Sequence, residues 1–169
     1  MNKIILETNN LKKSFNHADG KITLFENFNI KIKEGELVAL VGPSGSGKSS
    51  LLHLLALLDD PTKGEIILNK QETQHLSNYQ KDELRRSSVS IIFQDNNLLT
   101  DFTAIENVMM PLIIKGENTK EIFKKAEQIL KNVKIFNRSK HFPNQLSGGE
   151  QQRIAIARAL IAETKIILA

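Results

Sequence analysis

The stretch that decides the fold of this chain is Gly42-Pro43-Ser44-Gly45-Ser46-Gly47-Lys48-Ser49. This octapeptide, called the phosphate loop below, fits the pattern G-x-x-x-x-G-K-[ST] at every fixed position. The apolar run before it, residues 37–41, is typical of a strand buried on both faces, and the leucine-rich residues 50–58 have helical length. A strand, a glycine-rich loop and a helix in this order predict an α/β protein with a phosphate site.

The residue types of the phosphate loop suit a nucleotide. Its glycines let consecutive backbone N–H groups approach phosphates, and the helix N-terminus adds about half a positive charge. Lys48 is expected to reach the β and γ phosphates, and the Ser49 hydroxyl to ligate Mg²⁺. A glycine-rich turn with a capping serine would leave the lysine unexplained. The predicted ligands are ATP and Mg²⁺, and the predicted ATP-binding residues here are Gly42, Pro43, Ser44, Gly45, Ser46, Gly47, Lys48, Ser49 and Ser50.

A second glycine-bearing turn occurs far along the chain, at Leu146-Ser147-Gly148-Gly149-Glu150. Ser147 and Glu150 have the spacing of a capping box, which predicts a helix over residues 151–160. A cap does not explain the two glycines, because each costs about 1 kcal/mol relative to alanine inside a helix. Bare backbone at a helix start suits close approach to a phosphate, so this turn is interpreted as a second phosphate contact.

Residues 146–153, which end in Gln152-Arg153, resemble the signature of the ATP-binding cassette family. The resemblance implies that this signature closes over the γ phosphate held by a second copy of the chain. Leu146, Ser147, Gly148, Gly149 and Glu150 would then act in trans, and ATP would drive homodimerisation. It also implies an α/β P-loop NTPase fold with a RecA-like core, an antiparallel β edge and an α-helical subdomain. One domain is expected over residues 1–169, with the helical subdomain at about 95–145.

The resemblance assigns roles to two further residues. A predicted strand over residues 89–93 ends at Gln94, which corresponds to the family's glutamine that touches Mg²⁺ or the attacking water and links to the membrane partner. Phe15 stands where the family often has an aromatic that stacks on adenine, a contact worth about 1–3 kcal/mol in nucleic-acid systems. A phenylalanine that simply packs in the core is the alternative at this position.

Residues 119–133 have apolar side chains at helical spacing, which predicts an amphipathic helix whose start is capped by Asn118 with Glu121. Acidic residues interrupt its basic face. We therefore expect this helix to pack on its own domain rather than on a membrane surface. The apolar stripe consists of Ile122, Ala126, Ile129, Leu130 and Val133.

Residues 50–55, 58–65 and 97–112 are similar to the ATPases of lipoprotein-releasing transporters. In this family residues 97–112 form part of the surface that faces the membrane subunit. Cassettes of the macrolide-efflux and cell-division types share much of this surface and remain alternatives. The resemblance implies a homodimer beneath two membrane subunits, on the cytoplasmic side of the inner membrane of a Gram-negative bacterium. It implies no direct contact with lipid.

Composition is that of a soluble globular protein, with 40% hydrophobic and 25% charged residues and no cysteine. The net charge is +4, but the lysines are scattered among acidic residues, so no direct contact with nucleic acid is expected. A cassette ATPase that acts on nucleic acid remains the alternative. A stand-alone P-loop kinase or GTPase would leave the signature without a role.

Residues 165–169 predict another buried strand. In the resembling family an aspartate that helps to hold Mg²⁺ and a general-base glutamate follow this strand, and a switch histidine lies further on. None of the three is present in the 169 residues. The chain is therefore expected to be a truncated cassette that binds ATP and hydrolyses it negligibly, with Gln94 as its supporting residue for catalysis.

Overall fold

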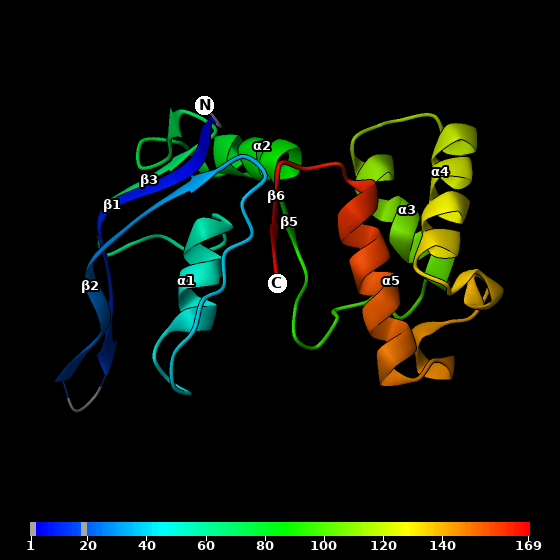
Figure 1. Ribbon diagram of the computed structural model, residues 1–169, viewed down its shortest axis with the longest axis horizontal. Coiled ribbons are helices and arrows are strands. Elements are labelled where there is room, and N and C mark those ends of the chain that lie inside the picture. Colours follow the sequence, from blue (N-terminus) through cyan, green and yellow to red (C-terminus); the bar gives the residue numbers. More distant parts are fainter. Residues whose placement is uncertain (1–2, 18–19) are drawn as a thin grey trace. The chain divides into compact units, whose positions relative to one another are not determined.

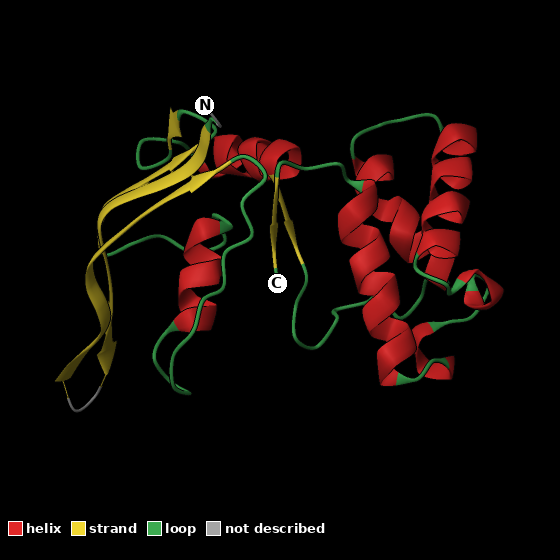
Figure 2. Ribbon diagram, in the orientation of Figure 1, coloured by secondary structure: helices red, strands yellow, loops and turns green. Residues whose placement is uncertain are grey.

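The computed structural model describes residues 3–17 and 20–169. The chain folds as two compact units, Met1–Ser88 and Val89–Ala169. Figure 1 labels the elements of both units. Figure 2 shows that the long strands lie in the first unit and that the second unit is mainly helical. Among the described residues, no helix has the length and apolar character needed to cross a membrane.

The first unit is built on an antiparallel sheet with the strand order β2-β1-β3-β4. This sheet is the antiparallel β edge that the family resemblance implies. Its inner face is apolar, with the side chains of Leu6, Leu11, Ile66 and Leu68 fully or almost fully buried. The strands are β1 (Ile4–His17), β2 (Gly20–Lys33), β3 (Lys63–Leu68) and β4 (Gln71–Glu72), and the helices of the unit are α1 (Lys48–Leu55) and α2 (Asn78–Ser88).

Gly64 marks a close crossing of β1 and β3. Its φ is +86°, and a Cβ added there would lie 2.3 Å from the carbonyl oxygen of Asn10. The pairing of the two strands shifts register between Asn9 and Lys12, at the same place. Only glycine satisfies both the backbone angle and the contact.

The predicted strand over residues 37–41 is wrong for this structure. The run is not hydrogen-bonded into the sheet, and Leu37 and Val41 are 101% and 85% exposed. An apolar run becomes a buried strand only when neighbouring strands satisfy its backbone groups, and the strands of the first unit pair with one another instead. The helix predicted at 50–58 is also shifted: α1 begins at Lys48 and ends at Leu55.

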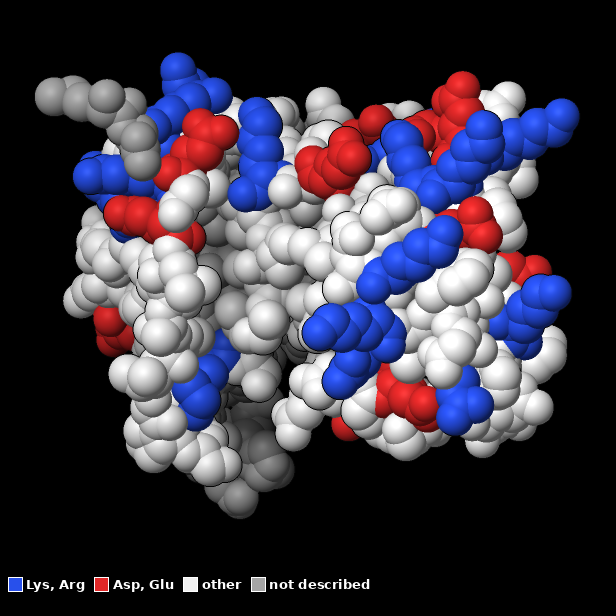
Figure 3. Space-filling view, turned by 45° about the vertical axis from the view of Figure 1, so that its right-hand side comes forward, with Lys and Arg blue, Asp and Glu red and all other residues white. Residues whose placement is uncertain are grey.

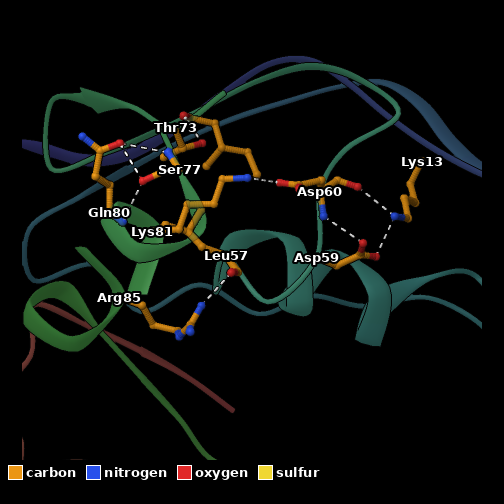
Figure 4. A network of polar contacts seen from close by, with 10 residues as sticks. Lys13, Leu57, Asp59, Asp60, Thr73, Ser77, Gln80, Lys81 and Arg85 are labelled. Atoms are coloured by element: carbon orange, nitrogen blue, oxygen red, sulfur yellow. Dashed lines mark hydrogen bonds and ion pairs between the residues drawn. The ribbon is translucent and has the colours of Figure 1, made fainter. Parts of the chain in front are cut away.

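A network of polar contacts fixes the segment between α1 and β3 (Figure 4). The Lys13 ammonium donates to the Asp60 carbonyl at 2.7 Å and lies 2.6 Å from the Asp59 carboxylate. From α2, Lys81 pairs with the Asp60 carboxylate, and Arg85 donates to the Leu57 carbonyl at 2.7 Å. A pocket of about 340 Å³ lies beside this segment, and the charged side chains in its lining are already engaged in ion pairs or hydrogen bonds.

The second unit consists of a short parallel strand pair and a helical cluster. Strands β5 (Val89–Ile91) and β6 (Ile166–Leu168) pair in parallel, which confirms the strands predicted at 89–93 and 165–169 in shortened form. A continuous apolar core joins the three long helices. The helical elements are α3 (Ala104–Ile114), α4 (Thr119–Asn132), η1 (Phe136–Arg138), η2 (Pro143–Gln145) and α5 (Gly148–Ile161).

Helix α4 confirms the predicted amphipathic helix that packs on its own domain. Ile122, Ala126 and Leu130 are fully buried in the core of the second unit, and Ile129 and Val133 pack against it. Asn118 caps the helix by accepting a hydrogen bond from the Lys120 amide at 3.0 Å.

Candidate functional site

The phosphate loop is an exposed turn that leads directly into α1. Within it the Ser46 amide donates to the Pro43 carbonyl at 3.3 Å, and the helix begins where the Leu51 amide donates to the Gly47 carbonyl at 2.8 Å. Gly47 has φ +87°, and an added Cβ would lie 3.2 Å from the Cβ of Leu24. The turn therefore needs glycine immediately before the helix, where backbone N–H groups face solvent.

Lys48 lies at the first position of α1 and folds back over the loop. Its ammonium donates to the carbonyl oxygens of Gly42 at 2.8 Å and Pro43 at 2.6 Å. No carboxylate pairs with Lys48 among the described residues, so its charge is balanced only by neutral carbonyl dipoles. A phosphate at this loop would find an ammonium group with no anionic competitor.

Ser49 and Ser50 follow on α1, with Ser49 exposed and Ser50 half-buried. The Ser49 hydroxyl makes no hydrogen bond to any other described residue, so it is available to a cation that bridges it to a phosphate. Across residues 3–17 and 20–169 no group of three or more His, Cys, Asp or Glu side chains forms a metal site. A serine hydroxyl with phosphate oxygens and waters is a ligand set that suits Mg²⁺.

Phe15 lies on β1 and is 45% exposed, so it is not a packed core residue. The Lys13 ammonium sits 4.9 Å from its ring centroid, a cation–π contact. The exposure of the ring is compatible with stacking on a base. Its role as an adenine platform stays a prediction.

The signature forms the start of α5, as predicted. Ser147 is the N-cap, and its hydroxyl accepts the Glu150 amide at 3.3 Å while the Glu150 carboxylate accepts the Ser147 amide at 2.8 Å. Leu146 is buried beneath this turn, whereas Ser147, Gly148 and Gly149 are exposed. A Cβ added at either glycine would meet nothing within 4 Å, so these glycines are not required by packing inside the chain.

Glu150 is the most perturbed carboxylate of the site. Hydrogen bonds from the Ser147 backbone, the Arg138 side chain and the Ser147 side chain lower its pKa from 4.5 to about 2. The Arg138 Nε atom lies 2.9 Å from Glu150 Oε1. The start of α5 therefore carries an ionised carboxylate paired with a guanidinium at any physiological pH.

Gln94 is exposed in the turn that follows β5. In this turn, the Asn96 amide donates to the Phe93 carbonyl at 3.1 Å. Arg158 of α5 holds the same turn by donating to the carbonyls of Asn96 and Asn97, each at 2.7 Å. Burial lowers the pKa of the Arg158 guanidinium, which nevertheless stays charged. Arg158 thus joins the turn that contains Gln94, called the glutamine turn, to α5, the helix that begins with the signature, within the second unit.

The loop after this turn, residues 98–103, is organised by Asn107 of α3. The Asn107 side chain is fully buried and bonds to the backbone of Leu99, Phe102 and Thr103. Leu99 and Phe102 remain 41% and 40% exposed. The loop that the sequence predicts to face a membrane subunit thus presents apolar side chains on a fixed backbone.

Sequence reasoning predicted roles for the phosphate loop, the signature and Gln94, and these stay predictions; it did not point to Arg138, Arg158 or Asn107. Asn107 carried a usable signal, because Asn107 and the capping residue Glu106 are the two polar residues of the otherwise apolar helix α3. The phosphate loop belongs to the first unit, and Gln94 and the signature belong to the second. The joint site of Ser49 and Gln94 for Mg²⁺ stays a prediction.

A lysine-bearing phosphate loop at a helix start, with a second glycine-bearing helix start, defines a P-loop nucleotide-binding protein. The profile of the family described as ABC transporter matches residues 25–169. The chain belongs to this family, which confirms the resemblance and the fold class predicted from the signature.

Similar proteins agree with this assignment. The chain is 46% identical, over 171 residues, to the lipoprotein-releasing system ATP-binding protein LolD of Rickettsia bellii (strain RML369-C), covering 100% of this chain and 74% of that protein. Two dimeric structures of the ATP-binding cassette MJ0796, one of them a post-hydrolysis state bound to ADP and Pi, are each 40% identical. Each matches with a TM-score of 0.91 over 96% of this chain and 72% of the other.

Proposed function

We propose that this chain is the ATP-binding subunit of a transporter that uses ATP to release lipoproteins from the inner membrane. The observation that carries the proposal is the state of its two phosphate-facing segments. Among the described residues Lys48 has no anionic partner, and Gly148 and Gly149 leave the backbone at the start of α5 open to solvent. The Lys48 ammonium and the backbone N–H groups of Gly148 and Gly149 are therefore available to a phosphate.

In this proposal ATP and Mg²⁺ bind at Gly42 to Ser50, with Lys48 on the phosphates and Ser49 on the metal ion. Gln94 contributes to the Mg²⁺ site or positions the attacking water, and Phe15 stacks on adenine. The signature of a second copy completes the site, so ATP closes a homodimer. The dimeric cassettes similar to this chain support that arrangement.

The proposed partners are two integral membrane subunits, with the homodimer attached to the cytoplasmic side of the inner membrane of a Gram-negative bacterium. Support comes from the identity to a lipoprotein-releasing ATP-binding protein and from the exposed apolar side chains of Leu99 and Phe102 in the loop at residues 98–103. Basic and acidic side chains are interspersed over the face in Figure 3, which favours a protein partner over nucleic acid. Tagged protein that co-purifies with macrolide-efflux or cell-division subunits, or with DNA in a salt-sensitive manner, would contradict lipoprotein release.

We further propose that a polypeptide of residues 1–169 hydrolyses ATP only at background rate. ATP hydrolysis belongs to the family, but residues 1–169 offer no counterpart of its magnesium-binding aspartate, general-base glutamate or switch histidine. Positioning of the phosphates alone does not place the attacking water. Steady-state phosphate release well above the level of a Lys48→Ala variant would contradict this.

The shared site is tested with Ser147→Arg. The introduced side chain fills the open start of α5, so the variant should bind fluorescent ATP like the wild type yet stay monomeric with Mg-ATP in analytical ultracentrifugation. Asn118→Arg is the matched control, because it places the same side chain at the N-cap of α4. Dimerisation of Ser147→Arg at wild-type ATP concentrations would refute the trans role of the signature.

A further inference from the structure

The signature of this chain ends in a glutamate whose two carboxylate oxygens are both occupied. Glu150 Oε2 accepts hydrogen bonds from the Ser147 amide at 2.8 Å and from the Ser147 hydroxyl at 3.0 Å. Glu150 Oε1 accepts one from Arg138 Nε at 2.9 Å, an ion pair in which the arginine is 42% and the glutamate 25% exposed. Three residues from two segments therefore form one polar unit at the start of α5.

The Glu150 carboxylate competes with any phosphate that uses Ser147. A serine hydroxyl has one proton to donate, and here it is directed to Glu150. The amides of Gly148 and Gly149 have no partner among the described residues, so they alone are free for an anion. To bind a phosphate oxygen, the Ser147 hydroxyl must turn away from Glu150 while the amide of Ser147 keeps its bond.

The same carboxylate places a negative charge beside the expected phosphate. A phosphate oxygen bonded to Ser147 would lie within about two hydrogen-bond lengths, roughly 6 Å, of Glu150 Oε2. Like charges at that distance repel unless a counter-ion intervenes. Because the pKa of Glu150 is held at about 2, protonation cannot remove this charge at neutral pH.

We propose that Arg138 is a positioning residue of the signature. It orients Glu150 and neutralises its charge, so that Ser147, Gly148 and Gly149 can donate hydrogen bonds to the phosphate of a second subunit's ATP. The proposal rests on the function proposed above and adds a residue outside the signature to the same site.

The surroundings of Arg138 hold it for this role. It ends η1, and its Nη1 atom lies 3.4 Å from His141 Nε2. The segment that follows is fixed to α3, because the Ala104 amide donates to the His141 carbonyl at 2.8 Å and the Ile105 amide to the Ser139 carbonyl at 2.9 Å. The guanidinium is thus presented to Glu150 from a backbone that is itself hydrogen-bonded to a helix start.

Charge variants separate positioning from packing. In Arg138→Gln the unpaired Glu150 carboxylate should raise the Mg-ATP concentration needed for dimerisation about tenfold, the order expected for one unscreened charge near a protein surface. In the double variant Arg138→Gln with Glu150→Gln, that concentration should return to that of Glu150→Gln alone, because a neutral amide needs no counter-ion. Arg138→Lys should recover part of the loss, and the deficit of Arg138→Gln should shrink at high salt.

The measurements are sedimentation of the full chain with Mg-ATP and fluorescent ATP binding by the monomer. Lys125→Gln is the matched control, since it removes one cation from another exposed ion pair of the same unit. All variants should bind ATP as monomers with wild-type affinity and melt within a few degrees of the wild type.

Two failures are distinguishable. If the wild type dimerises and Arg138→Gln dimerises equally well, or if adding Glu150→Gln does not restore Arg138→Gln, the positioning role of Arg138 is refuted. If the wild type itself stays monomeric with Mg-ATP, or Ser147→Arg dimerises normally, the proposed function fails and the role of Arg138 falls with it.

Discussion

Replacement of Asn107 tests how the structure holds the exposed loop at residues 98–103. The Asn107 side chain accepts the Leu99 amide at 2.7 Å and donates to three carbonyls: Leu99 at 3.0 Å, Phe102 at 3.0 Å and Thr103 at 3.1 Å. One buried amide therefore bonds the backbone of three of the six residues in a loop that has no regular secondary structure.

The cost of Asn107→Ala follows from these contacts. Leaving the Leu99 amide without an acceptor costs about 1–3 kcal/mol, and each lost carbonyl contact costs about 0.5–1.5 kcal/mol at most, because two N–H groups serve three carbonyls. Part of this is recovered by water, since Leu99 and Phe102 are partly exposed. We expect a loss of about 2–4 kcal/mol in the free energy of unfolding of the second unit.

Asn107→Asp has nearly the same shape and tests the polarity of the site. Its carboxylate can still accept the Leu99 amide, but it faces three carbonyl oxygens, and burial raises the pKa of the introduced acid. An acid with a raised folded pKa binds more protons in the native state, so stability falls as the pH rises above the unfolded value of about 3.9. The variant should therefore be less destabilised at pH 4 than at pH 7.

Urea unfolding gives the global loss, and amide hydrogen exchange at Leu99 reports local opening of the loop. Asn132→Ala is the control, because the Asn132 side chain is exposed and, among the described residues, bonds only to the Gln128 side chain. A loss below about 0.5 kcal/mol for Asn107→Ala, or equal losses for Asn107→Asp at both pH values, would refute the reasoning.

Two further predictions concern the backbone and pH. Gly64→Ala places a methyl group 2.3 Å from the Asn10 carbonyl oxygen at a residue with φ +86°. We expect the free energy of unfolding to fall by at least about 2 kcal/mol and the amide chemical shifts of β1 and β3 to change. Wild-type stability of this variant would show that the strand crossing relaxes freely. Because the pKa of Glu150 is lowered from 4.5 to about 2, the stability that it contributes is fully present above about pH 4.5 and is lost as the pH falls toward 2. Glu150→Gln should flatten that part of the acid unfolding curve, whereas identical curves for both proteins would contradict the shift.

Local patterns predicted much of the fold and of the candidate site. The turn at residues 42–49, the capping box of Ser147 and the stripe of α4 each follow from contacts within a few residues, and the structure contains all three. The antiparallel edge followed from the family resemblance instead. Predictions from residues that are close in sequence hold in the folded protein, because tertiary contacts rarely override a turn geometry and a helix cap together.

Prediction from local sequence patterns failed where a residue's structure depends on a partner that is distant in the sequence. Residues 37–41 have the composition of a buried strand, but strand formation depends on neighbours, and the strands of the first unit pair elsewhere. Arg158 reaches the glutamine turn across 61 and 62 residues, so no local spacing pointed to it.

The sequence by itself determined the chemistry of this protein: a lysine on a glycine-rich turn, a serine at the next position and a second helix start with bare backbone. These features depend on local geometry, which the order of residues sets directly. Only the tertiary structure decided that Arg138 neutralises the signature glutamate and that Asn107 carries the loop at residues 98–103. Both depend on which side chains meet when helices pack into a common core, and that is a property of the folded chain.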